Sequence, residues 1–212
     1  MDQELRVVED RRRFLKRGSV FALSLGALPL RLAHGGLLAP QRPTRIEVVG
    51  RAEPGIRLLM RGAVYDKQGK PVPNVKVFLY QTDAAGYYNQ PVNSPRQARL
   101  HGTVWSDAAG QYSFSTIRPA HYADMNPPPP MHIHVHLEPP GLPNHWVDSY
   151  YFAGDAHLRS DDVARSRGLE QFANIVILTP DNAGVLQGAR DFLLDPVLAE
   201  RNQLVNGWYR PA

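Results

Sequence analysis

The chain has 212 residues, of which 43% are hydrophobic, with 19 prolines and 17 glycines, so it can form one buried core but offers little material for helices. It contains no cysteine, which excludes disulfides, thiolate zinc sites and iron–sulfur clusters, so a bound metal needs nitrogen and oxygen ligands. The formal charge is +4, but seven of the 24 Lys and Arg and four of the 20 Asp and Glu lie in positions 1–35, which leaves 17 basic and 16 acidic residues. The body is therefore nearly neutral, and its charge does not indicate a nucleic-acid partner.

The first 35 residues are typical of an export signal. Three arginines at 11–13 and Lys16 precede a mildly apolar stretch at 18–30, which is shorter than the ~20 residues that a transmembrane helix needs. This order resembles a twin-arginine signal, so we expect residues 1–35 to engage the twin-arginine export machinery. The protein is then periplasmic or secreted, with the signal cleaved or retained as a membrane anchor. A disordered basic arm is the alternative.

After an expected linker at 36–56, short apolar stretches alternate with turns rich in Gly, Pro, Asp and Asn. Helical turns are expected only near residues 161–167 and 196–202. This pattern predicts an all-β fold for residues 57–212, a β-sandwich of two sheets with long loops and short helical turns. The expected strands are 58–64, 75–80, 103–105, 111–114, 132–137, 149–152, 175–178 and 190–194.

The most informative motif joins a phenol at Tyr122, four prolines at 127–130 and three alternating imidazoles. Because successive strand side chains point to opposite faces, His132, His134 and His136 share one face. The proline run is expected to form an extended loop that returns Tyr122 toward this strand. His136 lies ~13 Å along the strand from His132, so only the first two histidines can reach one ion, and we expect His136 to be a neighbour of the site or a surface residue.

Phenolate is a hard anionic oxygen donor and imidazole a borderline nitrogen donor. Without thiolate, this mixture suits ferric iron better than copper(I) or zinc. Two alternatives remain open from the residues alone. The histidines can lie on a solvated strand face, or His132, His134 and Glu138 can form the first half of a cupin metal site, although His145 and His157 do not match the rest of that pattern.

Several further motifs occur in order between residues 60 and 194. They are Gly62-x-Val64, Gly-Lys-Pro-Val-Pro-Asn-Val at 69–75, Gln-Thr-Asp-Ala-Ala-Gly-Tyr-Tyr at 81–88, Asp-Ala-Ala-Gly-Gln-Tyr-Ser-Phe-Ser-Thr-Ile-Arg-Pro at 107–119, Tyr122, His132-Ile-His134 and Tyr-Phe-Ala-Gly-Asp at 151–155. Together they resemble the intradiol ring-cleavage dioxygenases, the catechol and protocatechuate 3,4-dioxygenase group. The resemblance implies a β-sandwich that holds non-haem Fe(III) through Tyr88, Tyr122, His132 and His134.

The same resemblance implies an activity, the cleavage of a small catechol-type aromatic by O₂ between its two hydroxyl-bearing carbons. In that scheme iron activates the diol, and Tyr122 leaves the iron to act as the base that accepts a catechol proton. The other three ligands stay bound. The sequence leaves the ring substituents open, and it is compatible with a homo-oligomer.

Three positions depart from the family pattern. Pro129 stands where well-studied members have arginine, Ser149 where they have glutamine, and Asp124 where many have an aromatic residue. Losses of groups around metal ligands typically cost about 10–100-fold in activity or affinity. An exported metal-binding β-sandwich without ring-cleaving activity is therefore the alternative function. The residues that could replace the missing groups, with none favoured, are Arg118, His121, Asp124 and Asp148.

Overall fold

The computed structural model of the protein describes residues 42–90, 94–142 and 144–195. All of them belong to one compact unit, Pro40–Ala212. The predicted export signal at 1–35 and the predicted helical turn at 196–202 lie outside the described residues.

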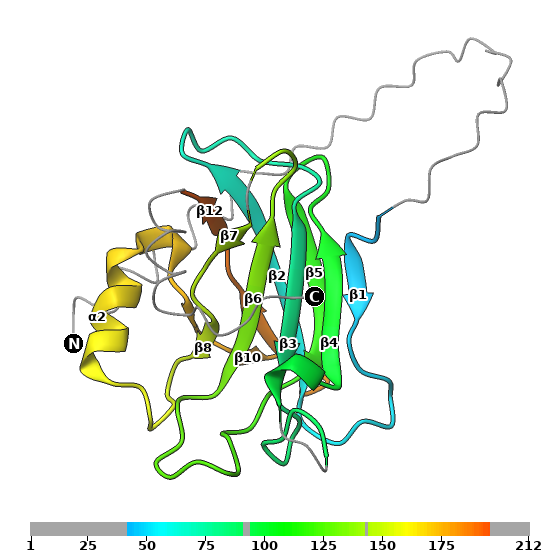
Figure 1. Cartoon of the computed structure of the whole chain (residues 1–212), viewed down its shortest axis with the longest axis vertical. Helices are drawn as coiled ribbons and strands as arrows, with labels where there is room; N and C mark the ends of the chain where they lie inside the picture. The colour runs from blue at the N-terminus through cyan, green and yellow to red at the C-terminus, as the bar shows by residue number, and fades with distance from the viewer. Residues whose placement is uncertain (1–41, 91–93, 143, 196–212) are drawn as a thin grey trace, which may run out of the picture. The chain divides into compact units, whose positions relative to one another are not determined.

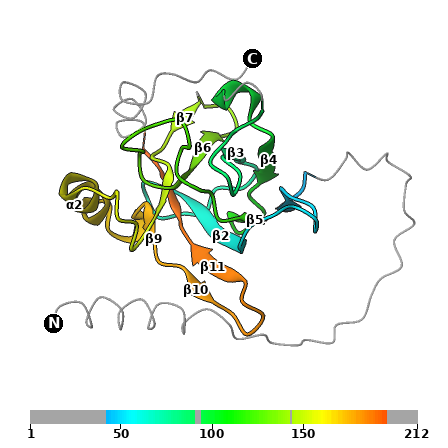
Figure 2. The same cartoon turned by 90° about the horizontal axis from the view of Figure 1, so that it is seen from below.

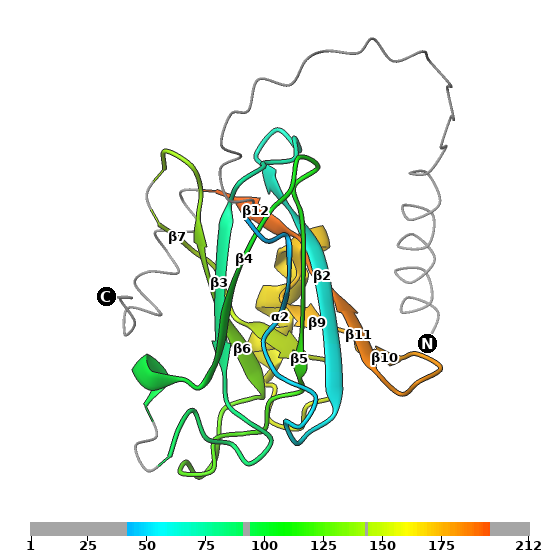
Figure 3. The ribbon, with the colours of Figure 1, turned by 90° about the vertical axis from the view of Figure 1, so that its right-hand side faces the viewer.

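The described strands form two six-stranded sheets (Figure 1). The first sheet has the order β1-β5-β2-β11-β10, with β12 also paired to β2, and the second has the order β4-β3-β6-β8-β9, with β7 also paired to β6. Figure 3 shows the two sheets edge-on as separate layers, which confirms the predicted β-sandwich. The strands are β1 (Arg45–Glu47), β2 (Arg57–Asp66), β3 (Lys76–Gln81), β4 (Leu100–Trp105), β5 (Gln111–Ile117), β6 (His132–Glu138), β7 (His145–Trp146), β8 (Tyr150–Phe152), β9 (Ile175–Val176), β10 (Thr179–Pro180), β11 (Leu186–Ala189) and β12 (Phe192–Leu194).

The hydrophobic core lies between the sheets and is filled by alternate residues of the central strands. Ile133, Val135 and Leu137 of β6 are buried there, opposite residues of β2 such as Leu58 and Met60. Because strand side chains alternate, the three histidines of β6 must lie on its other face, away from the core. The strand is therefore fixed by core packing on one side and presents imidazoles on the other.

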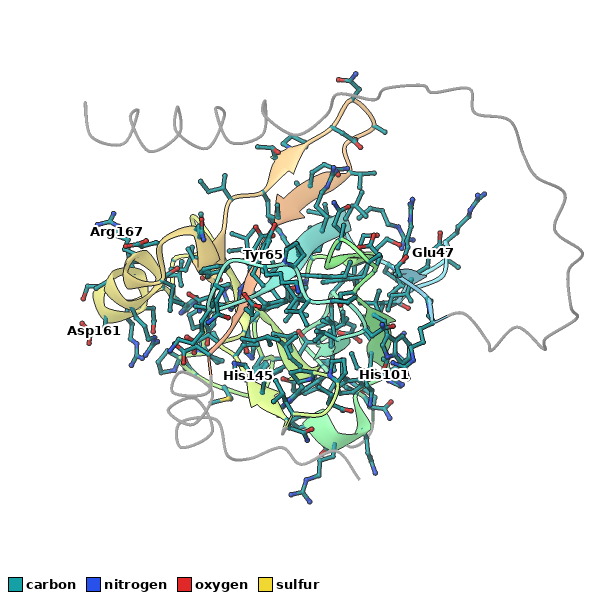
Figure 4. The ribbon with its side chains drawn as sticks, turned by 90° about the horizontal axis from the view of Figure 1, so that it is seen from above. Glu47, Tyr65, His101, His145, Asp161 and Arg167 are labelled. Carbon is teal, nitrogen blue, oxygen red and sulfur yellow. The ribbon has the colours of Figure 1, made fainter. Side chains whose placement is uncertain are left out.

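In the described residues, helical structure is limited to short elements, one of which confirms the helical turn predicted near residues 161–167. The described helices are α2 (Ser160–Gly168) and the 3₁₀ turns η1 (Pro95–Gln97) and η2 (Glu170–Phe172). Charged side chains of α2, such as Asp161 and Arg167, point away from the sheets (Figure 4). None of the helices in the described part of the chain has the length and apolarity that a membrane crossing requires.

Four of the described strands, β1, β7, β10 and β11, were not expected from the sequence. β1 lies in the stretch expected as linker, yet it pairs in parallel with β5 and places Ile46 opposite Phe114. A three-residue strand gives too few positions for a periodic pattern. β11 contains Gly188, where a Cβ would lie 2.6 Å from the sulfur of Met60, so glycine permits close packing of this strand. The hairpin of β10 and β11 projects beyond the body of the sandwich (Figure 2).

Candidate metal centre

One strand and two loops bring the four predicted ligand residues together. His132 and His134 come from the start of β6, Tyr88 from the loop that follows β3, and Tyr122 from the loop between β5 and β6. Both loops lie at the lower end of the second sheet in Figure 1. The site is thus on the outer face of that sheet, at the end where β3 stops and β6 begins.

The donor atoms of these four side chains lie within hydrogen-bonding distance of one another. Tyr88 Oη is 2.8 Å from His134 Nε2, and Tyr122 Oη is 2.7 Å from His132 Nε2 and 3.2 Å from His134 Nε2. The two Nε2 atoms are 3.0 Å apart, and the two phenol hydroxyls hydrogen-bond each other. Two ligands held about 2.0–2.1 Å from one ion at a right angle are separated by about 2.8–3.0 Å. The four atoms therefore have the mutual spacing that a single metal ion requires.

The described residues contain no group of three or more His, Cys, Asp or Glu side chains placed to hold a metal. A metal at this site would therefore depend on the two phenols as well as the two imidazoles. That donor set, with two hard oxygens and two borderline nitrogens, fits ferric iron.

Contacts behind the two imidazoles fix their orientation. His132 Nδ1 lies 2.7 Å from Pro130 O and must donate to it, so we assign the lone pair to Nε2, which faces the other donors. His134 Nδ1 has a long contact of 3.4 Å with Ser149 Oγ. The ring of Tyr80 stacks on His134, with centroids 4.4 Å apart and planes 9° from parallel. No motif in the sequence pointed to Tyr80, because its register opposite His134 depends on how two distant strands pair.

Burial sets the protonation of the cluster. It lowers the pKa of both His132 and His134, so both imidazoles are neutral at pH 7 and their lone pairs can bind a metal. Burial raises the pKa of Tyr122 to about 12, against a lowering by the Tyr88 hydrogen bond. Burial and the neighbouring charge of Tyr122 raise the pKa of Tyr88 further. Without a cation both phenols keep their protons, and a trivalent ion would have to displace them.

His136 lies on the same strand face but outside the cluster of four donors. It is buried, with its ring stacked on that of Tyr80 at a centroid distance of 6.1 Å and tilted against that of Phe78 at 6.3 Å. Burial lowers the pKa of His136 to about 4. It is therefore a neighbour of the site, and the expectation of a surface residue is wrong. The alternative of a solvated histidine face is also wrong, because His132 is buried too.

Glu138, the third ligand that the cupin alternative requires, does not lie beside His132 and His134. Glu138 lies at the far end of β6 and pairs with Lys76, with Nζ and Oε1 2.9 Å apart. His157, the later histidine that this pattern would use, contacts the ring of His121 instead. The structure does not gather these residues around His132.

The positions that depart from the family pattern have identifiable surroundings. Ser149 stands where the family pattern has glutamine, and its Oγ lies 3.4 Å from Nδ1 of His134. Asp124 is exposed, and its charge contributes to raising the pKa of both Tyr88 and Tyr122. Of the four candidate replacements, His121 contacts Asp155, with its Nε2 3.0 and 3.1 Å from the two carboxylate oxygens.

A family model described as Dioxygenase (Dioxygenase_C) matches residues 34–196. The chain belongs to the intradiol dioxygenase family. It is 35% identical over 141 residues to the protocatechuate 3,4-dioxygenase beta chain of Burkholderia cepacia, which covers 59% of this chain and 60% of that protein. It is 30% identical over 119 residues to a catechol 1,2-dioxygenase of Candida albicans, which covers 49% of this chain and 39% of that protein. The chain thus spans less than two thirds of the length of either relative.

Solved structures of this family share the fold. The dioxygenase domain of a dioxygenase and carbohydrate-binding protein fusion from Streptomyces sp. SirexAA-E superimposes with a TM-score of 0.55 at 25% identity, over 77% of this chain and 96% of that chain. The family that the chain belongs to is one of dioxygenases, a class of oxidoreductases.

Proposed function

We propose that the protein is a non-haem Fe(III) dioxygenase that cleaves a catechol-type aromatic between its two hydroxyl-bearing carbons with O₂. The observation that supports this most directly is the meeting of two phenol oxygens and two imidazole Nε2 atoms, each within 3.2 Å of another. Tyr88, Tyr122, His132 and His134 would hold the ion. Bound ferric iron would supply a Lewis acid that binds the diol oxygens and makes the ring reactive toward O₂.

The two tyrosines differ in how firmly they are held. Tyr88 is buried and packs with Tyr80 and Ala98 in a small cluster of its own. Tyr122 is only partly buried, and the loop residues that directly follow it, 123–127, are exposed. Tyr122 is therefore the ligand that can swing away and accept a proton from an incoming diol hydroxyl, while Tyr88 stays in place.

We also propose that residues 1–35 direct export, a proposal that rests on the three arginines at 11–13 and the apolar stretch at 18–30. The alternative function is a metal-binding sandwich of the same fold without ring-cleaving activity. Pro129, Ser149 and Asp124 favour it, because they stand where the family has groups that polarise or orient the substrate.

Metal content, the visible spectrum and oxygen uptake test the proposal together. The iron-loaded protein should be coloured by phenolate-to-iron charge transfer and should consume O₂ with catechol, hydroxyquinol or protocatechuate. Tyr88→Phe should change the charge-transfer band and reduce activity. Tyr112→Phe is a matched control, because Tyr112 also hydrogen-bonds another buried tyrosine, Tyr150, at 2.8 Å but lies in the core between the sheets.

The outcomes separate the two functions. A protein that binds iron without colour contradicts both the phenolate ligands and the proposed reaction. A coloured protein that consumes no O₂ with any of the three diols favours the metal-binding alternative.

A further inference from the structure

Asp155 connects segments that are far apart in the sequence. It follows β8, and its side chain is fully shielded from solvent, with 0% of its surface exposed. The carboxylate accepts hydrogen bonds from Met131 N at 2.7 Å, from His157 N at 2.8 Å, and from His121 Nε2 at 3.0 and 3.1 Å to its two oxygens. Burial would raise the pKa of Asp155, but these hydrogen bonds lower it, so the group is ionised.

Two of these partners are chain neighbours of candidate ligands. His121 precedes Tyr122, and Met131 precedes His132. Since the peptide unit is planar and rigid, a hydrogen bond at one residue restricts the position of the next. One carboxylate therefore restrains both ends of the loop at 123–130, whose own residues 123–127 are exposed.

The same region contacts the segment that carries Tyr88. Ala123 N donates to Gly86 O at 3.2 Å, and a Cβ on Gly86 would lie 2.2 Å from His121 O. The backbone around Tyr122 is thus packed against the Tyr88 loop on one side and tied to Asp155 on the other. Displacing His121 would disturb both contacts.

We propose that Asp155 is a positioning residue that holds the Tyr122 and His132 segments at the spacing a metal ion needs. It touches neither the ion nor the substrate, and the proposal rests on the proposed function only for the identity of that ion. The carboxylate suits this role because it can accept all three donors at once, and hydrogen bonds to a charged acceptor are stronger than those to a neutral one. An amide at this position has one acceptor oxygen, so its NH₂ group would face a buried N–H donor.

The test compares Asp155→Asn with Asp162→Asn. Asp162 is a matched control, because it is also a buried carboxylate, with hydrogen bonds from Arg159 N at 3.1 Å and Arg165 Nη2 at 2.7 Å, but it belongs to helix α2. Fe(III) affinity is measured by competition with a chelator, together with the charge-transfer band and the melting temperature of the iron-free protein. Asp155→Asn should weaken iron binding by about 10–100-fold and change the band. Asp162→Asn should lower the melting temperature and leave the affinity and the band unchanged.

His121→Phe is a second variant for the case in which Asp155→Asn does not fold. It removes one donor and keeps a ring beside His157, so it should weaken iron binding in the same direction but by less. Unchanged iron affinity and an unchanged band in both folded variants would overturn the proposal, even if their melting temperatures fall. A wild-type protein that binds iron but cleaves no diol would refute the proposed function, whereas the affinity ratio between wild type and Asp155→Asn would still decide the role of Asp155.

Discussion

The buried histidine beside the candidate site makes the iron-free fold sensitive to acid. His136 is 8% exposed and packs against the rings of Tyr80 and Phe78, and burial lowers its pKa from 6.5 to about 4. As the pH falls below 6.5, His136 becomes protonated in the unfolded chain. In the folded protein it stays neutral until about pH 4. The free energy of unfolding must therefore fall across this window as the pH is lowered.

The size of the effect follows from the difference between the two pKa values. A difference of about 2.5 units corresponds to about 3 kcal/mol over the whole window, of which about 2 kcal/mol is lost between pH 7 and pH 5. His136→Phe removes the proton site and keeps a ring of similar size beside Tyr80 and Phe78. The variant should therefore lose about 2 kcal/mol less than the wild type when the pH is lowered from 7 to 5.

Urea unfolding of the iron-free protein at both pH values, with a chelator present, measures this difference. Other titrating groups are common to both proteins, so their contributions cancel when the two losses are compared. If wild type and His136→Phe lose the same free energy of unfolding between pH 7 and pH 5, the inference that His136 is buried in its neutral form is refuted.

Three further predictions concern the site and its loops. Tyr80→Leu removes the ring stacked on His134, a contact that contributes about 0.5–1.5 kcal/mol. A chelator competition should therefore show iron affinity reduced by about 2–10-fold. Unchanged affinity would show that the stack does not hold His134 in place. Gly86→Ala introduces a Cβ 2.2 Å from His121 O at a residue with φ of +87°. Urea unfolding should show a free energy of unfolding lower by at least about 1–3 kcal/mol. An unaltered midpoint would count against the close contact. Because both phenols are protonated in the iron-free protein, iron binding should release about two protons, so apparent affinity should fall about 100-fold for each pH unit lowered; a pH-independent affinity would contradict tyrosinate ligands.

The sequence predicted β5 and β6 well because apolar residues alternate with polar ones along each of them. In β6, three apolar residues face the core and three histidines face outward, so both the strand and the shared histidine face could be derived from spacing alone. The short strands β1 and β11 were missed for the opposite reason. Their pairing with β5 and β2 is decided by neighbours distant in the sequence, and their few residues carry no pattern of their own.

The site was predicted less evenly. The histidine pair followed from local geometry, but Tyr88 could be singled out only through the family resemblance, because a tyrosine after an Asx turn also occurs as an ordinary packed residue. Asp155 belongs to the motif at 151–155, but the sequence did not indicate what it does. Its hydrogen-bond partners Met131 and His121 are 24 and 34 residues away, so no local pattern links them to it. That the four residues bind iron stays a prediction.

The candidate ligands are anchored in two different ways, and this difference bears on the proposed reaction. His132 and His134 belong to a strand whose opposite face is locked into the core, so they cannot move without disturbing packing throughout the sandwich. Tyr122 has no such strand behind it, and its backbone is held through His121 and its contact with Asp155. If Tyr122 is the ligand that gives way to the diol, its side chain must rotate while that tether keeps its backbone in place. The carboxylate would then limit the movement of Tyr122 to a rotation that returns the phenol to the same ion after each turnover.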